Sequence, residues 1–454
     1  MSTIAAIATP PVPCAIGILR VSGEAAFAVA ERVFRPRGDK PLTAGPVRTM
    51  LYGDMLDARG RVIDTGLCCL FAAGHSYTGE ASAELYCHGS PVVLNEVLSA
   101  LFAAGAVQAR AGEFTQRAFL NGRMDLLQAE AVADLIDAET AACARNAAGQ
   151  LGGALSRSVE RVYDALMDIA SRYYAVVDYP DEDIGDVTLS DMRRTLIDAQ
   201  AALRELLDTF SRGQLLKNGV PTVLLGRPNV GKSSLLNALL GYDRAIVTDI
   251  PGTTRDTVEE KLVVRGLLLR LIDTAGIRPS ADAVEHLGVE RSRAAAEKAA
   301  LALVVVDGSR PLTPEDEAVF ALARQVPHAV AVVNKDDLPR QADLAAIKRR
   351  FGSAVAVSAQ QGSGLAALED AIAAQFPREE APCGELLTNA RQQEEAARAL
   401  RALEAAWESL EAGMTPDAVL TDIEGALAAL GELNGKTLRE DLVAAIFSRF
   451  CVGK

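Results

Sequence analysis

Hydrophobic and polar residues follow different rhythms in successive parts of this 454-residue chain. Up to about residue 118, short apolar runs such as 15–21 and 66–71 have the composition of strands and are separated by Gly and Pro turns. Two short helical patterns lie between them. This mixture predicts an α+β domain over residues 1–118.

From residue 119 to 215 the apolar residues recur at helical spacing, as in 126–136 and 195–210, with few helix breakers. Helical composition returns after residue 380, mainly over 388–448. Each of these flanks alone is a poor bundle, so the pattern predicts one discontinuous helical domain made of residues 119–215 and 380–454.

Between these flanks, residues 216–379 alternate strand-like and helix-like runs, which is typical of a doubly wound α/β domain. The predicted fold class is therefore multidomain: an α+β N-terminal domain, a helical bundle and an inserted α/β domain of the P-loop, Ras-like type.

A phosphate-binding motif opens the α/β domain. Gly226-Arg-Pro-Asn-Val-Gly-Lys-Ser233 follows the apolar run 223–225 and precedes the helix-prone run 235–240. This strand, loop and helix context is the one a P-loop needs. Backbone N–H groups would bind phosphate oxygens, Lys232 would reach the β- and γ-phosphates, and Ser233 would hold Mg²⁺.

Three further segments complete a guanine-nucleotide site. Asp273-Thr-Ala-Gly276 ends the apolar run 267–272, where its carboxylate can hold the metal shell and Gly276 can donate to the γ-phosphate. Asn334-Lys-Asp-Asp337 follows the strand-like run 328–333. Asp337 can accept from guanine N1–H and its amine, a pair of donors that adenine lacks. Ser358-Ala359 follows run 354–357 and fits guanine O6.

Composition limits the remaining possibilities. The formal net charge is −14 and the isoelectric point is near 5.0, so nonspecific electrostatic binding of nucleic acid is not expected to be the main activity. The seven cysteines form no C-x-x-C pair, which argues against a zinc ribbon or a disulfide framework. Their odd number and scattered positions favour a reducing cytoplasm. No run is apolar enough to span a membrane, so a soluble chain is expected.

Several segments outside the P-loop carry a family resemblance: 8–11, 17–20, 77–80, 111–121, 178–182 and the ending Phe450-Cys-Val-Gly-Lys454. Together with the order of domains, they make the whole chain resemble the MnmE (TrmE) family of tRNA modification GTPases. The resemblance implies a GTPase that, with the flavoprotein MnmG (GidA), adds a carboxymethylaminomethyl or aminomethyl group at C5 of the wobble uridine of certain tRNAs.

The resemblance also implies ligands and partners. These are GTP, Mg²⁺, K⁺, a tetrahydrofolate derivative in the N-terminal domain (5-formyl- or methylene-tetrahydrofolate), a homodimer, a heterotetramer or larger complex with MnmG, and tRNA bound with partner help. The position after Gly276 is Ile277, which cannot orient water as a Gln would. The resemblance implies that Glu285 orients water and that K⁺ replaces an arginine finger.

The predicted site residues can be given by ligand. GTP is expected to contact Asn229, Val230, Gly231, Lys232, Ser233, Ser234, Thr248, Asp249, Ile250, Pro251, Gly252, Thr253, Thr254, Asp273, Thr274, Ala275, Gly276, Asn334, Lys335, Asp337, Ser358 and Ala359. Mg²⁺ is expected on Ser233. The resemblance implies that Thr254 joins it, that K⁺ binds Asn229, Thr248, Ile250 and Thr253, and that folate binds Arg20, Glu84, Arg123 and Lys454.

Two other functions stay open at the level of sequence. One is a ribosome-assembly or regulatory GTPase switch without modification chemistry. The other is a folate-dependent one-carbon enzyme whose GTPase is only a regulator.

Overall fold

The computed structural model describes residues 2–38, 40–178, 188–242, 260–272, 293–376, 384–437, 446–448 and 450–453. Their contacts divide into two compact units. The first contains residues 1–133, 149–204 and 394–454, and the second contains residues 134–148 and 205–393. The three predicted domain boundaries stay a prediction.

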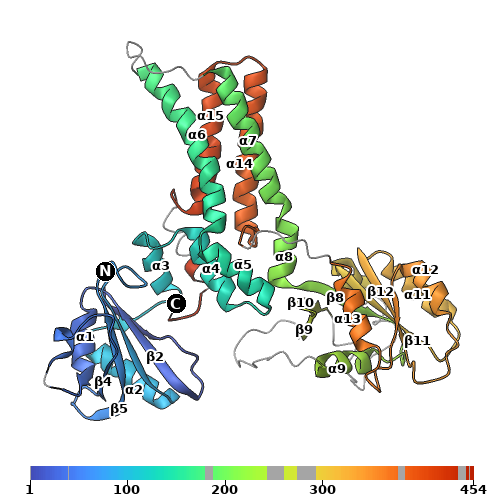
Figure 1. Ribbon diagram of the computed structural model, residues 1–454, viewed down its shortest axis with the longest axis horizontal. Coiled ribbons are helices and arrows are strands. Elements are labelled where there is room, and N and C mark those ends of the chain that lie inside the picture. The colour runs from blue at the N-terminus through green and yellow to red at the C-terminus, as the bar shows by residue number, and fades with distance from the viewer. Residues whose placement is uncertain are drawn as a thin grey trace. The chain divides into compact units, whose positions relative to one another are not determined.

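A seven-stranded sheet with order β3-β4-β5-β6-β2-β1-β7 forms the N-terminal part of the first unit (Figure 1). Its strands pair antiparallel, except that β1 and β7 are parallel. The strands are β1 (Ile4–Ile7), β2 (Cys14–Ser22), β3 (Phe34–Pro36), β4 (Leu51–Leu56), β5 (Val62–Phe71), β6 (Ser82–Gly89) and β7 (Val107–Gln108). Strands β2 and β5 contain the two predicted apolar runs.

Helices α1 (Ala26–Val33) and α2 (Pro91–Ala103) pack on this sheet, and a short 3-10 helix covers Leu42–Ala44. One core forms between them: Val29 and Val33 of α1 and Leu94 and Leu101 of α2 are buried against strand residues such as Leu19. The predicted α+β character is therefore seen in these residues.

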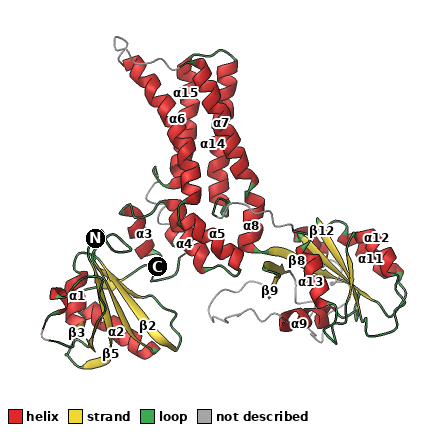
Figure 2. Ribbon diagram, in the orientation of Figure 1, coloured by secondary structure: helices red, strands yellow, loops and turns green. Residues whose placement is uncertain are grey.

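The first unit also contains long antiparallel helices that lie side by side (Figure 2). They are α6 (Ala154–Asp178), α7 (Leu189–Asp208), α14 (Ala390–Glu411) and α15 (Pro416–Asn434). In α14 the buried residues Ala396, Ala399, Leu403, Ala406 and Leu410 recur every three or four positions, which aligns them along one face. Of the shorter helices, α3 (Glu113–Leu120) and most of α4 (Leu126–Ile136) belong to the first unit, whereas most of α5 (Ala141–Leu151) and all of α8 (Phe210–Asn218) belong to the second.

Residues near the C-terminus pack on the N-terminal part of the first unit. Val452 forms an isolated antiparallel bridge with Ala111, and the Gly112 N–H donates to the Cys451 carbonyl at 3.3 Å. A Cβ on Gly453 would lie 2.4 Å from the Ile7 carbonyl oxygen. The segment is therefore in direct backbone contact with residues near the start of the chain.

The second unit is built on a six-stranded sheet with order β13-β12-β11-β8-β10-β9. All neighbouring pairs are parallel except β9 and β10. The strands are β8 (Val220–Leu225), β9 (Glu260–Val264), β10 (Leu267–Leu271), β11 (Leu301–Asp307), β12 (His328–Asn334) and β13 (Ala354–Ala356). Every residue of β11 is buried, as expected for a strand covered on both faces.

Helices flank this sheet, and separate clusters of buried apolar residues form its two faces. The helices are α9 (Lys232–Tyr242), α11 (Pro314–Ala323), α12 (Leu344–Phe351) and α13 (Leu365–Ala373). Helix α11 begins with a capping box between Thr313 and Asp316. This arrangement confirms the predicted α/β layer. Within the described part of the chain, no helix has the length and hydropathy needed to cross a membrane.

Candidate nucleotide-binding site

The P-loop lies where the strand order of the second unit changes direction. Strand β8 has β11 on one side and β10 on the other, so the chain leaves it at the switch point of the sheet. Open α/β sheets bind ligands at this point, outside the carboxyl ends of the strands. Residues 226–231 connect β8 directly to the first turn of α9.

The backbone of this loop adopts positive φ angles and passes close to the Asn334 side chain. Gly231 has a φ of 97°, and a Cβ there would lie 2.2 Å from the Asn334 amide nitrogen. Asn229 also adopts a positive φ, 65°, which asparagine tolerates better than most residues. The loop therefore has the backbone form that turns N–H groups toward an anion.

Lys232 lies at the start of α9 and folds back over the loop. Its ammonium donates to the carbonyl oxygens of Gly226 at 2.5 Å and Arg227 at 2.9 Å. Burial lowers the pKa of Lys232, because the charged form is partly removed from water. A phosphate group would relieve this cost by pairing with the ammonium.

Asn334 links the predicted base-binding segments to the P-loop. This side chain is 2% exposed; its nitrogen donates to the Val230 carbonyl at 2.9 Å, and its oxygen accepts from the Ala359 N–H at 3.1 Å. Ser358 donates its hydroxyl to Asp337 at 2.5 Å. The structure thus brings together segments 226–234, 334–337 and 358–359, as the motifs predicted.

An ion pair that the motifs did not reveal holds the segment 334–337 against the end of β11. Lys335, with a φ of 64°, places its ammonium 2.7 Å from the Asp307 carboxylate. Burial would raise the pKa of Asp307, but Lys335 and Ser309 outweigh it and the pKa is lowered. The sequence shows only that Asp307 ends a wholly apolar run. The structure adds that Asp307 is the strand neighbour of Asn334.

The remaining predicted nucleotide and metal residues lie outside the described residues. They are Thr248, Asp249, Ile250, Pro251, Gly252, Thr253, Thr254, Asp273, Thr274, Ala275, Gly276 and Glu285. Lys454 of the predicted folate set is also outside them.

Three predicted folate residues are described, and two of them touch. Arg20 of β2 places its Nε 3.0 Å from the Glu84 carboxylate of β6, and the side chains are 20% and 18% exposed. The Tyr86 hydroxyl donates to the other Glu84 oxygen at 2.6 Å. Burial and this carboxylate raise the pKa of Tyr86. Arg123 instead donates to the Gly74 carbonyl at 3.1 Å.

Comparisons with known proteins cover both ends of the chain. A family model described as "GTP-binding protein TrmE N-terminus" matches residues 3–123, and one described as "MnmE helical domain" matches residues 126–451. The chain is 42% identical over 457 residues to the tRNA modification GTPase MnmE of Alkaliphilus metalliredigens. It is 45% identical over 455 residues to that of Chloroflexus aurantiacus. Each alignment covers 100% of this chain and 99% of the relative.

Among solved structures, a point variant of Era from Aquifex aeolicus bound to GDP.AlF4- is similar to part of the chain. The match has a TM-score of 0.27 and 25% sequence identity, and it covers 40% of this chain and 65% of Era.

The P-loop at the switch point and the Asn334 contacts define a guanine-nucleotide-binding protein of the P-loop class. The full-length relatives and the two family models then identify the family. The chain belongs to the MnmE family of tRNA modification GTPases.

Proposed function

We propose that this protein hydrolyses GTP with Mg²⁺ and K⁺ and, together with a flavoprotein of the MnmG type, modifies C5 of the wobble uridine of certain tRNAs with an aminomethyl or carboxymethylaminomethyl group. The observation that carries the proposal is the direct link between P-loop and base-binding loops through Asn334 in a chain of this family.

The described residues fit the nucleotide they would hold. Lys232 is partly buried, and among the described residues its ammonium bonds to two uncharged carbonyl groups. A phosphate group would give this buried charge an anionic partner. Asp337 would accept from guanine, and Ser358 holds one of its oxygens. Mg²⁺ would be held by Ser233 and Thr254, and would neutralise charge on the phosphates.

Water activation is assigned to Glu285 and the monovalent cation to Asn229, Thr248, Ile250 and Thr253. Ile277 cannot orient water, so another residue must do so, and the family resemblance assigns this role to Glu285. A K⁺ near the phosphates would offset developing negative charge as a guanidinium does in other GTPases. In this proposal two protomers pair through their nucleotide domains, and the uridine chemistry takes place elsewhere.

The N-terminal residues fit a folate derivative. The Arg20 and Arg123 guanidinium groups suit its carboxylates, and Glu84 can accept from pterin N–H groups. Lys454 completes the proposed set. When bound, a tetrahydrofolate derivative would supply the one-carbon unit.

Nucleoside mass spectrometry tests the proposal. The measurement compares wobble uridines in tRNA from cells that contain the protein, cells that lack it and deficient cells that regain the gene. We expect the C5 substituent to disappear in the deficient cells and to return on complementation. Unchanged wobble uridines would contradict the modification role and leave the ribosome-assembly alternative.

A further inference from the structure

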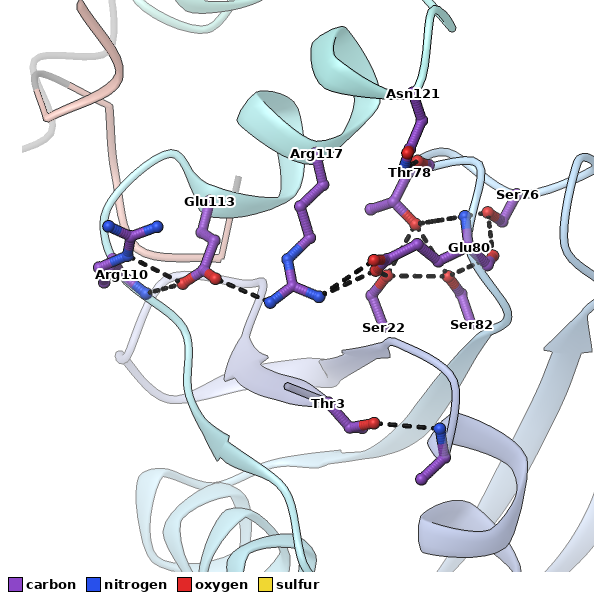
Figure 3. Close-up of polar contacts among 11 residues, drawn as sticks. Thr3, Ser22, Ser76, Thr78, Glu80, Ser82, Arg110, Glu113, Arg117 and Asn121 are labelled. Carbon is purple, nitrogen blue, oxygen red and sulfur yellow. Dashed lines mark hydrogen bonds and ion pairs between the residues drawn. The ribbon is translucent and has the colours of Figure 1, made fainter. Parts of the chain in front are cut away.

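A buried ionic cluster lies in the first unit (Figure 3), whereas the nucleotide-binding motifs belong to the second. Arg117 of α3 is 3% exposed, and its guanidinium lies between two carboxylates. One terminal nitrogen is 2.9 Å from Glu80, and the other is 2.8 Å from Glu113. Buried ion pairs often add little net stability, so we ask which segments of the chain this cluster holds in position.

The two carboxylates belong to different segments of the chain. Glu80 is in the loop between β5 and β6, where it also accepts from the Ser22 hydroxyl at 2.8 Å. Glu113 begins α3 and accepts from the Arg110 N–H at 2.8 Å. Burial would raise the pKa of Glu113, but the Arg110 and Arg117 donors outweigh it and the pKa is lowered. Arg117 therefore ties the loop to the helix through two charged contacts.

The same two segments provide the rings around Arg20. The guanidinium carbon of Arg20 is 5.3 Å from the centroid of Tyr77, in the loop, and 5.8 Å from that of Phe114, in α3. The Tyr77 and Thr115 hydroxyl groups are hydrogen-bonded at 2.9 Å. Aromatic faces at this distance attract a guanidinium and restrict its orientation. Arg20 therefore contacts one ring from each of the two segments that Arg117 joins.

We propose that Arg117 is a positioning residue for Arg20 in ligand recognition. This inference rests on the proposed folate site, because Arg20 is one of the residues assigned to that site. Arg117 fixes the loop against α3 with the two arms of its planar fork, and the rings of Tyr77 and Phe114 transmit this placement to Arg20. A lysine would keep the charge at this position but could not bridge both carboxylates with a rigid fork.

The test measures binding of 5-formyltetrahydrofolate to the full-length protein by calorimetric titration. We expect Arg117→Lys to weaken the affinity about tenfold or more, because small displacements of a binding group are costly. GTP turnover should stay at the wild-type rate, since Arg117 lies in the other unit. The matched control is Arg110→Ala, which removes an exposed side chain that also pairs with Glu113. Its affinity should be unchanged.

A double-mutant cycle separates positioning from general stabilisation. Tyr77→Leu removes one of the rings through which Arg117 acts. In that background Arg117→Lys should cost clearly less affinity than it does in the wild type. Equal costs in the two backgrounds would overturn the inference, as would wild-type affinity in Arg117→Lys itself. If Arg117→Lys fails to fold, Glu113→Gln, which keeps size and one acceptor, replaces it in the same cycle.

The outcome also distinguishes the two proposals from each other. If the wild-type protein does not bind 5-formyltetrahydrofolate, the folate site is wrong. If the wild type binds and the cycle shows no coupling, the folate site stands and the role of Arg117 is wrong.

Discussion

Asn334 shows how one side chain can join three loops. Its amide nitrogen and oxygen both bond to backbone groups, one in the P-loop and one beside Ser358, and the side chain is almost wholly buried. Removing it would leave the Val230 carbonyl and the Ala359 N–H without this partner. Buried polar groups that lose a partner cost about 1–3 kcal/mol.

We therefore expect Asn334→Ala to lower the free energy of unfolding of the second unit by about 1–3 kcal/mol and to weaken GTP binding. Urea unfolding and titration with a fluorescent GTP analogue measure the two effects. The control is Asn218→Ala, since Asn218 is exposed and bonds to Gln214 at the end of α8. Wild-type affinity in Asn334→Ala would show that the link between the loops is dispensable.

Motifs predicted that segments 226–234, 334–337 and 358–359 come together, because their spacing is short and their backbone contexts are local. Their role as nucleotide ligands stays a prediction. Other contacts could not be predicted in this way. Glu80 and Arg117 are separated by 37 positions and belong to no spaced pattern. Their pairing depends on how α3 packs against the loop. Lys335 and Asp307 meet because two parallel strands end side by side, which the sequence indicates only after the strand order is known.

At the scale of elements, α8 makes a close backbone contact. A Cβ on Gly213 would lie 1.9 Å from the Leu387 carbonyl oxygen, and the Leu387 N–H donates to the Thr209 hydroxyl at 3.0 Å. Lys217, also in α8, places its ammonium 2.7 Å from Asp134 at the end of α4. Helix α8 is therefore fixed on two sides directly before β8.

The surroundings of two helical glycines predict opposite effects of alanine substitution on the free energy of unfolding. Gly213→Ala should lower the free energy of unfolding by about 1–3 kcal/mol, because the added methyl group collides with a backbone oxygen. Gly425→Ala in α15 meets only the Ala402 side chain at 3.6 Å, so it should raise the free energy by about 0.5–1 kcal/mol. Thermal unfolding of the two variants checks the signs, and stabilisation by Gly213→Ala would refute the close approach.

Element prediction succeeded where apolar periodicity was long. The run 126–136 is helix α4, and the run 328–333 lies within β12. Short strands such as β1, β7 and β9 were not predicted. Two to five residues carry too little periodicity to separate a strand from a loop, and these strands depend on pairing with distant neighbours.

At the scale of the whole molecule, the two units are interleaved along the sequence. The first is assembled from three stretches of chain and the second from two. The apolar pattern predicted an interrupted helical domain because neither flank could form a good bundle alone, and that division stays a prediction. It could not predict that α5 and α8 group with the nucleotide-binding sheet, because that depends on tertiary contacts.

The proposed cation dependence belongs to the complete protein, since it involves two paired protomers. We expect faster GTP hydrolysis in K⁺ than in Na⁺ at equal ionic strength, because only the fitting cation would offset charge at the phosphates. Steady-state phosphate release measures the rates. Asn229→Gly keeps the positive φ of this position and removes the amide, so it should abolish the difference. Equal rates in the two salts would remove the K⁺ assignment.

The backbone contacts of Ala111, Gly112 and Ile7 with residues 451–453 have a consequence for biosynthesis. Translation proceeds from the N-terminus, and domains generally fold as they leave the ribosome. Here the partners of Ala111 and Gly112 are translated only after the entire nucleotide-binding sheet. The contacts of Ala111 and Gly112 with residues 451 and 452 can therefore form only after the second unit has been synthesised. A chain whose synthesis ends before residue 451 would contain the nucleotide-binding sheet but an unfinished first unit.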